Sequence, residues 1–257
     1  MSSSTGKGLY LGIDIGGSGI KGAPVDLDKG EFATERKRIE TPKKATPEAV
    51  AEIVAQIAEG FADEVGEDSP VGVTVPAVVH HGVTRSAANI DDSWIDTDAD
   101  KLFTKVLGRS VVVMNDADAA GEAEVHYGAG KDVKGVVLMT TLGTGIGSAL
   151  FVEGRLVPNT ELGHLELDGA EAEDRAASSV REDEDLSWKE WAERLQRFYR
   201  HLEDLFWPEL IIVGGGVSKK ADSFLPLLDL RTKIVPAALR NDAGIIGAAW
   251  HAKHTKD

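Results

Sequence analysis

The residues best suited to chemistry lie at the end of a short apolar run. Residues 111–114 (VVVM) have the pattern of a buried strand, and Asn115 and Asp116 follow it directly, where a helix is predicted to begin. In open α/β sheets, ligands bind at the carboxyl ends of the strands. A carboxylate at this place can cap a helix, bind a sugar hydroxyl or act as a general base, and Asp116 taken alone leaves all three roles open.

Three glycine-rich turns could bind phosphates through their backbone N–H groups. Two of them resemble each other, because each lies between two apolar stretches predicted to be strands. This internal repeat predicts two similar halves, each with a glycine hairpin that contacts a phosphate chain. The third turn follows the predicted buried strand 208–213. The polar and glycine residues of the three turns are Gly16, Gly17, Ser18, Gly19 and Lys21; Thr141, Gly143, Thr144 and Gly145; and Gly214, Gly215 and Gly216.

The first turn also matches the dinucleotide fingerprint through Gly17, Gly19 and Gly22. That fingerprint requires a helix after the turn, whereas Pro24 follows here with the apolar spacing of a strand. The pattern therefore favours a β-hairpin and argues against a nicotinamide-dependent dehydrogenase.

The other elements position further polar residues. Glu161 and His164 are spaced so that both can reach one hydroxylated ligand. Thr46 and Pro47 predict a helix start, and Ser187 with Glu190 forms a capping box for a long helix. On that helix we expect two i,i+4 ion pairs, Glu190 with Arg194 and Glu193 with Arg197.

Composition excludes several classes of function. The 257 residues contain no cysteine, so disulfides and thiolate metal sites are excluded. A formal net charge of −15 disfavours nucleic acid and anionic membranes as partners. No apolar run approaches a membrane span or a signal peptide core, so we expect a cytoplasmic protein. The adjacent His80 and His81 are assigned to a loop rather than to a metal site.

Taken together, the motifs resemble the ROK family of sugar kinases. The resemblance implies an α/β protein with the actin-like ATPase (ribonuclease H-like) fold, in which two similar domains have a cleft between them. We expect an N-terminal domain of residues 1–116, joined by a C-terminal helix at 242–257, and a C-terminal domain of residues 117–241. The motifs that carry the resemblance are residues 14–22 (DIGGSGIKG), 115–117 (NDA), 142–147 (LGTGIG), 161–164 (ELGH) and 214–218 (GGGVS).

Within the family, the chain is most similar to the branch that uses polyphosphate. Residues 158–166, 175–179, 85–89 and 235–239, together with Trp94, carry this closer resemblance. It implies a glucokinase that transfers a phosphoryl group from inorganic polyphosphate, as family members often also do from ATP, to the 6-hydroxyl of glucose. The missing cysteines remove the zinc motif of many ROK proteins. Two alternatives remain open: a non-catalytic ROK-type sugar sensor, and an ATP-dependent hexokinase of other specificity.

The resemblance also implies roles for individual residues. Asp116 would be the catalytic base, and Asp14 would hold Mg²⁺ through water. The three glycine turns would bind the donor phosphates. A homodimer without zinc is expected, and Lys21, Arg175, Arg181, Lys219 and Lys220 are candidates for a basic polyphosphate track. The sugar would be bound by Asn89, Asn115, Asp116, Glu161, His164 and Glu173.

Overall fold

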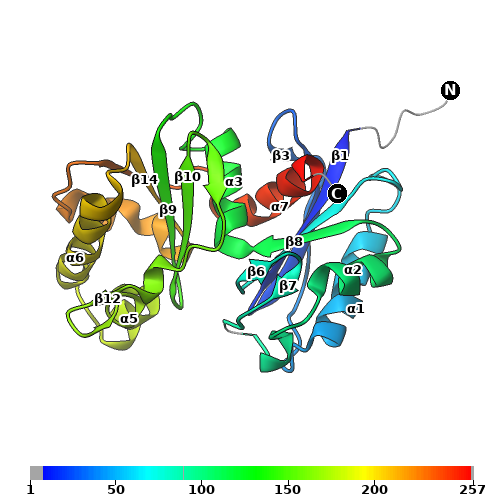
Figure 1. Cartoon of the computed structure of the whole chain (residues 1–257), viewed down its shortest axis with the longest axis horizontal. Helices are drawn as coiled ribbons and strands as arrows, with labels where there is room; N and C mark the ends of the chain where they lie inside the picture. The colour runs from blue at the N-terminus through cyan, green and yellow to red at the C-terminus, as the bar shows by residue number, and fades with distance from the viewer. Residues whose placement is uncertain (1–7, 89, 256–257) are drawn as a thin grey trace. The chain divides into compact units, whose positions relative to one another are not determined.

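The computed structural model describes residues 8–88 and 90–255, and the chain divides into two compact units (Figure 1). Unit 1 consists of Met1–Ala123 and Asp242–Asp257, and unit 2 of Glu124–Asn241. Among the described helices, none has the length and apolar character needed to cross a membrane.

Unit 1 is built on a mixed sheet with the strand order β3-β2-β1-β5-β8, and β4 also pairs with β2. β1 and β2 form an antiparallel hairpin that closes at the pair Gly16 and Gly19, whereas β1, β5 and β8 are parallel. The predicted hairpin is confirmed, and Pro24 lies within β2. The main elements are β1 (Leu9–Gly16), β2 (Gly19–Asp26), β3 (Glu31–Phe32), β4 (Lys37–Ile39), α1 (Pro47–Glu59), β5 (Val71–Val75), α2 (Ala99–Leu107), β8 (Val111–Asn115), α3 (Asp116–Tyr127, which belongs to unit 2 from Glu124 onward) and α7 (Ala243–His254).

Helices cover both faces of this sheet. On one face, α7 packs so closely that a Cβ added to Gly12 would lie 1.9 Å from the carbonyl oxygen of Ile245. On the other face, a Cβ at Gly22 would lie 2.6 Å from the side chain of Ile57 in α1. α1 begins as predicted, with the Thr46 hydroxyl accepting a hydrogen bond from the N–H of Ala49. The parallel strands are therefore buried on both faces, which explains their continuous apolar runs.

Unit 2 repeats this topology with the strand order β11-β10-β9-β14-β15. β9 and β10 form an antiparallel hairpin, and β9, β14 and β15 are parallel. The repeat seen in the sequence is therefore a repeat of strand topology. Its main elements are β9 (Val136–Leu142), β10 (Ile146–Val152), β11 (Arg155–Val157), η2 (Leu162–His164), β12 (Glu166–Leu167), β13 (Ala170–Glu171), α4 (Glu173–Ala176), α5 (Ser178–Asp183), α6 (Trp188–Phe206), β14 (Leu210–Gly214), η3 (Gly216–Ser223) and β15 (Lys233–Pro236).

The long helix α6 supplies much of the core of unit 2. Trp191, Leu195 and Leu202 are fully buried and pack with Leu138 and Ile211 of the sheet. The predicted capping box is present, because the Ser187 side chain accepts from the N–H of Glu190 and the Glu190 side chain accepts from the N–H of Ser187.

The predicted i,i+4 ion pairs along α6 are wrong. Arg194 donates instead to Glu184, at 2.6 Å, and Arg197 donates to both carboxylate oxygens of Asp168, at 3.0 and 3.1 Å. Both partners lie outside the helix, so these arginines hold the segment before α6 against it.

Candidate active site

The carboxyl edge of the sheet in unit 1 carries Asp14. Its Oδ1 atom accepts a 2.8 Å hydrogen bond from the hydroxyl of Thr74 on β5, and its Oδ2 atom lies 3.7 Å from Nζ of Lys21 on β2. A Cβ added to Gly244, in the first turn of α7, would lie 3.2 Å from Oδ1. Asp14 is thus a partly exposed carboxylate held from both neighbouring strands, and carboxylate oxygens are ligands that Mg²⁺ prefers.

Asn115 and Asp116 lie where β8 ends and α3 begins. The Asn115 side chain caps the helix, because its Oδ1 atom accepts from the N–H groups of Ala117 and Asp118 at 2.8 and 3.1 Å. Its Nδ2 atom donates to the carbonyl of Ala77 at 3.1 Å. Asn115 therefore fills the cap role that was open for Asp116. Asp116 is the first residue of α3, is half-buried, and accepts a 2.8 Å hydrogen bond from the N–H of Ala117.

The first glycine turn exposes Gly17 and Ser18 to solvent between β1 and β2. Arg38 donates to the carbonyl oxygen of Ser18 at 2.7 Å, and Thr41 donates to that of Gly16 at 2.5 Å. Two carbonyl groups of the turn are therefore held by side chains, which fixes the shape of the turn. Asn89, also predicted to bind the sugar, lies outside the described residues.

In unit 2, the second and third glycine turns lie side by side. Thr141 on β9 is in register with Gly214 on β14. Gly215 has a φ of 82°, and a Cβ there would lie 2.2 Å from the carbonyl oxygen of Leu142. Only glycine permits both this conformation and this close approach. The turn at Gly143 and the turn after Gly214 consequently form one surface.

Glu173 joins this surface to the segment predicted to bind the sugar. Its Oε2 atom accepts a 3.0 Å hydrogen bond from the N–H of Ile146, and it would lie 2.6 Å from a Cβ at Gly145 and 3.1 Å from one at Gly163. Its Oε1 atom lies 3.7 Å from Nδ1 of His164. The structure therefore brings Glu173 and His164 together, as predicted for one ligand site.

Three carboxylates surround His164. Glu171 contacts its Nδ1 atom at 2.7 Å, and Glu161 lies 3.9 Å from its Nε2 atom on the other side of the ring. The hydrogen bond to Glu171 raises the pKa of His164, with smaller contributions from the charges of Glu173, Glu171 and Glu161. Burial raises the pKa of Glu161. His164, Glu171 and Glu173 also present ligand atoms within 4.8 Å of one another, so a cation could bind them.

Glu171 is a candidate site residue that the sequence prediction missed. It lies in β13, opposite Glu166 of β12, and the hairpin between them turns at Asp168 and Gly169, both with positive φ. Asp-Gly is a strong signal for a tight hairpin turn. That dipeptide could have revealed the hairpin that carries Glu171.

The segment that carries Glu161 is anchored by Ser148 of β10. The buried Ser148 hydroxyl donates to the carbonyl of Thr160 at 2.6 Å and accepts from the N–H of Leu162 at 3.0 Å. Glu161 lies between these two contacts, so the sheet fixes its backbone directly.

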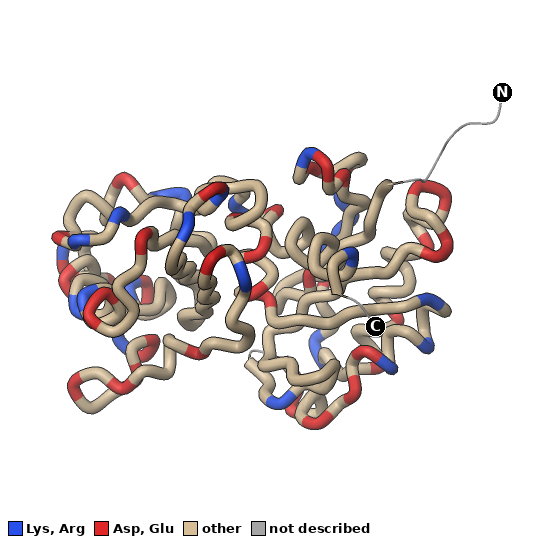
Figure 2. Tube along the Cα trace, turned by 45° about the horizontal axis from the view of Figure 1, so that its top comes forward, with Lys and Arg blue, Asp and Glu red and all other residues tan. Residues whose placement is uncertain are grey.

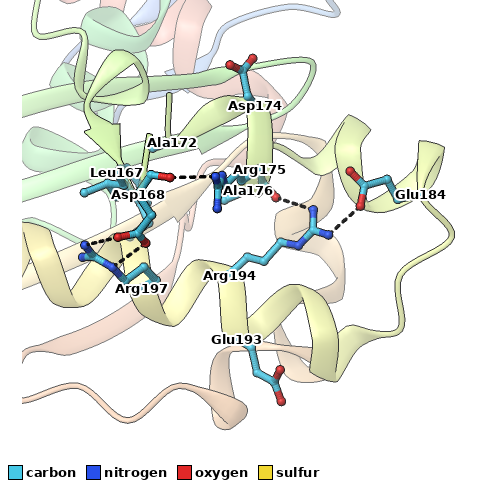
Figure 3. A pocket seen from close by; sticks show the side chains of 11 residues that line it. Leu167, Asp168, Ala172, Asp174, Arg175, Ala176, Glu184, Glu193, Arg194 and Arg197 are labelled. Atoms are coloured by element: carbon cyan, nitrogen blue, oxygen red, sulfur yellow. Dashed lines mark hydrogen bonds and ion pairs between the residues drawn. The ribbon is translucent and has the colours of Figure 1, made fainter. Parts of the chain in front are cut away.

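A cavity of about 470 Å³ lies beside α4 and is lined by three arginines (Figure 3). Arg197 and Arg194 are paired with Asp168 and Glu184, and Arg175 donates to the carbonyl oxygen of Asp168 at 3.0 Å. Arg181, another candidate for a phosphate track, stacks on Trp188, with its guanidinium carbon 3.7 Å from the ring centre. These arginines thus help to hold β12, α4, α5 and α6 together.

Comparison with known proteins identifies the family of this chain. Residues 10–180 match the model of the ROK family. The chain is 54% identical over 240 residues to a polyphosphate glucokinase of Mycobacterium tuberculosis (strain CDC 1551 / Oshkosh), covering 93% of this chain and 89% of that protein. It is 50% identical to a polyphosphate glucokinase of Mycobacterium leprae (strain TN), covering 96% of this chain and 76% of that protein.

Solved structures agree with these relatives. The inorganic polyphosphate/ATP-glucomannokinase of Arthrobacter sp. strain KM matches with a TM-score of 0.92 and 57% identity, over 96% of this chain and 99% of that one. A ROK family glucokinase of Streptomyces griseus, solved in complex with glucose and AMPPNP, matches with a TM-score of 0.82 and 24% identity, over 96% and 100% of the two chains. The second likeness shows a shared fold, the actin-like ATPase fold of ROK sugar kinases.

Proposed function

Because the chain belongs to the ROK family, we propose that it transfers a phosphoryl group from inorganic polyphosphate to the 6-hydroxyl of glucose. The observation that carries the proposal is the similarity, over nearly the whole chain, to two polyphosphate glucokinases and a polyphosphate/ATP-glucomannokinase. The name of the last protein supports ATP as a second donor and mannose as a second acceptor.

Asp116 is proposed as the catalytic base. Phosphoryl transfer asks a protein mainly for positioning and charge stabilisation, together with a group that takes the hydroxyl proton. As the new O–P bond forms, the 6-hydroxyl proton would pass to the Asp116 carboxylate. The O–P bond to the rest of the donor breaks, which leaves a shortened polyphosphate. Asn115 fits a supporting role, because its cap fixes the start of α3 and thereby the position of Asp116.

Glu161, His164 and Glu173 are proposed to bind the sugar hydroxyls. Carboxylates accept hydrogen bonds from hydroxyls, and a ring nitrogen of histidine can donate or accept. Since Glu171 contacts Nδ1, the Nε2 atom of His164 is the one left to face a ligand. Asn89 and Asn115 remain proposed sugar ligands on the strength of the family resemblance.

Mg²⁺ is proposed as the cation that accompanies the donor. The residues fit such an ion, because Asp14 presents a carboxylate that is 19% exposed and fixed by Thr74. When bound, Mg²⁺ would offset the negative charge of the donor phosphates. Asp14 would hold the ion through water, and Lys21 would add a positive charge beside it.

An assay for sugar 6-phosphate tests the proposal. Purified protein with Mg²⁺ and glucose should form glucose 6-phosphate with polyphosphate, and none without a donor. Mannose in place of glucose, and ATP in place of polyphosphate, define the acceptor and donor range. A protein that binds glucose but forms no product with either donor would be a sugar sensor instead.

A further inference from the structure

Two glycines of unit 2 are not explained by the fold. Apart from the adjoining residues of the chain, no described atom lies within 4 Å of the point where a Cβ of Gly143 or of Gly216 would be, and neither residue has a φ in the left-handed region. By contrast, a Cβ added to Gly215 would clash with Leu142, and one added to Gly145 would clash with Glu173. Gly143 and Gly216 are exposed, so the missing side chains leave room above the backbone. Glycine at such positions lets a ligand approach the main chain.

A pair of lysines follows this open surface. Lys219 and Lys220 lie in η3, whose start is fixed by the Ser218 hydroxyl donating to the carbonyl of Gly215 at 2.8 Å. Ser218 and Ala221 on either side are buried, whereas both lysines are exposed. Within the described part of the chain, neither lysine has a hydrogen-bonding or ion-pair partner on its ammonium group.

Lys219 and Lys220 share the lack of a carboxylate partner with other lysines of the described chain, and what sets them apart is their place directly after the third glycine turn. The net charge is −15, and acidic residues are spread along the traces of both units (Figure 2). The arginines around the cavity beside α4 are engaged by Asp168 and Glu184, as the dashed lines in Figure 3 show. A polyanion gains more from cations that have no carboxylate partner, because no existing ion pair has to be broken.

We propose that Gly143, Gly216, Lys219 and Lys220 form a site that selects polyphosphate as the donor. The glycine surface would admit the phosphate chain, and the lysines would contact phosphates beyond the one transferred. Polyphosphate carries charge along its whole length, whereas the charge of ATP is confined to a triphosphate that ends in a neutral nucleoside. The lysines therefore favour the longer anion. This inference rests on the proposed function and names the residues that set its donor preference.

The test is the double variant Lys219→Gln with Lys220→Gln. The KM for long-chain polyphosphate should rise about tenfold, since each lysine would supply a charge-assisted contact, and the KM for ATP should rise by much less. Shortening the polyphosphate should reduce the difference between variant and wild type. Raising the salt concentration should reduce it too, because salt screens exposed charges.

A matched control removes two charges elsewhere in unit 2. Lys131→Gln with Lys134→Gln changes two exposed lysines that precede β9, at the opposite end of the strand from Gly143. This control should leave both donor constants near wild type. The inference would be overturned if the KM rose equally for polyphosphate and ATP, or if the control variant raised the KM for polyphosphate as much as the test variant. It would also be overturned if the test variant left both KM values unchanged. If the wild-type protein uses neither donor, the proposed function itself has failed.

Discussion

At the scale of single residues, His164 has a ring whose orientation is fixed by a neighbouring carboxylate, as its proposed role in sugar binding requires. Glu171 holds Nδ1 at 2.7 Å, and a partner on one ring nitrogen determines the tautomer and the direction of the ring. The raised pKa of His164 also determines the direction in which the stability of the fold changes with pH. The folded chain binds this proton more tightly than the unfolded chain, so the pair stabilises fully below about pH 6.5 and its contribution is lost as the pH rises through the folded-state pKa.

Replacing Glu171 with Gln should lower the pKa of His164, because the negative charge beside the ring is removed. The KM for glucose should rise several-fold as the ring loses its charged partner. NMR titration of the histidine and steady-state kinetics measure the two effects. Glu166→Gln, which removes the same charge from the opposite strand of the hairpin, should change neither value. An unchanged His164 pKa in the Glu171 variant would contradict the account.

Asp116→Asn tests the base. The value of kcat should fall about 10³-fold, since a positioned general base contributes between about 10² and 10⁴. Glucose should still bind, and thermal unfolding with and without glucose would show the stabilisation that a bound ligand produces. A variant that keeps most of its kcat would exclude Asp116 as the base.

At the scale of elements, the glycine turns contain both glycines that the fold requires and glycines that we propose for donor binding. Gly215→Ala should destabilise the fold by about 2 kcal/mol or more, because its φ is positive and the added methyl meets Leu142. Gly143→Ala should leave the free energy of unfolding within about 0.5 kcal/mol of wild type but raise the KM for the donor. Denaturant unfolding measures the stability of both variants, and steady-state kinetics measure their KM for the donor. A Gly143 variant with an unchanged donor KM would remove this turn from the donor site.

Local sequence signals predicted the elements well. Pro24 indicated the first hairpin, and Ser187 with Glu190 indicated the start of α6, because each signal acts over a few residues of chain. The partners of Arg194 and Arg197 could not be predicted in this way. They depend on β12 and α5 folding back onto α6, so long-range packing decided against the i,i+4 neighbours.

The candidate site also contains residues that a local motif predicts and residues that only long-range packing places. Glu161 and His164 were predictable from one short motif, but the placement of Glu173 beside Gly145 and Gly163 depends on the turn at Asp168 and Gly169. Likewise, Asp116 at a strand end suggested a cap, and only the geometry shows that Asn115 takes this role.

At the scale of the whole molecule, one strand topology used twice explains where the candidate site residues lie within each unit. Each unit has an antiparallel hairpin followed by parallel strands, and each hairpin ends in a glycine turn. The two units differ in the polar residues at the strand ends. Unit 1 carries Asp14 and Asp116 there, whereas unit 2 carries the open glycine surface, Lys219 and Lys220, and the cluster around His164.

The central claim is transfer of phosphoryl groups from polyphosphate to glucose, and ³¹P NMR of a single reaction mixture tests it most directly. With glucose, Mg²⁺ and polyphosphate as the sole donor, glucose 6-phosphate should appear in an amount equal to the phosphoryl groups lost from the polyphosphate. While long-chain polyphosphate is in excess over glucose, no free orthophosphate should accumulate, because the hydroxyl rather than water is the acceptor. Orthophosphate released without glucose 6-phosphate, or polyphosphate that stays intact, would contradict the claim.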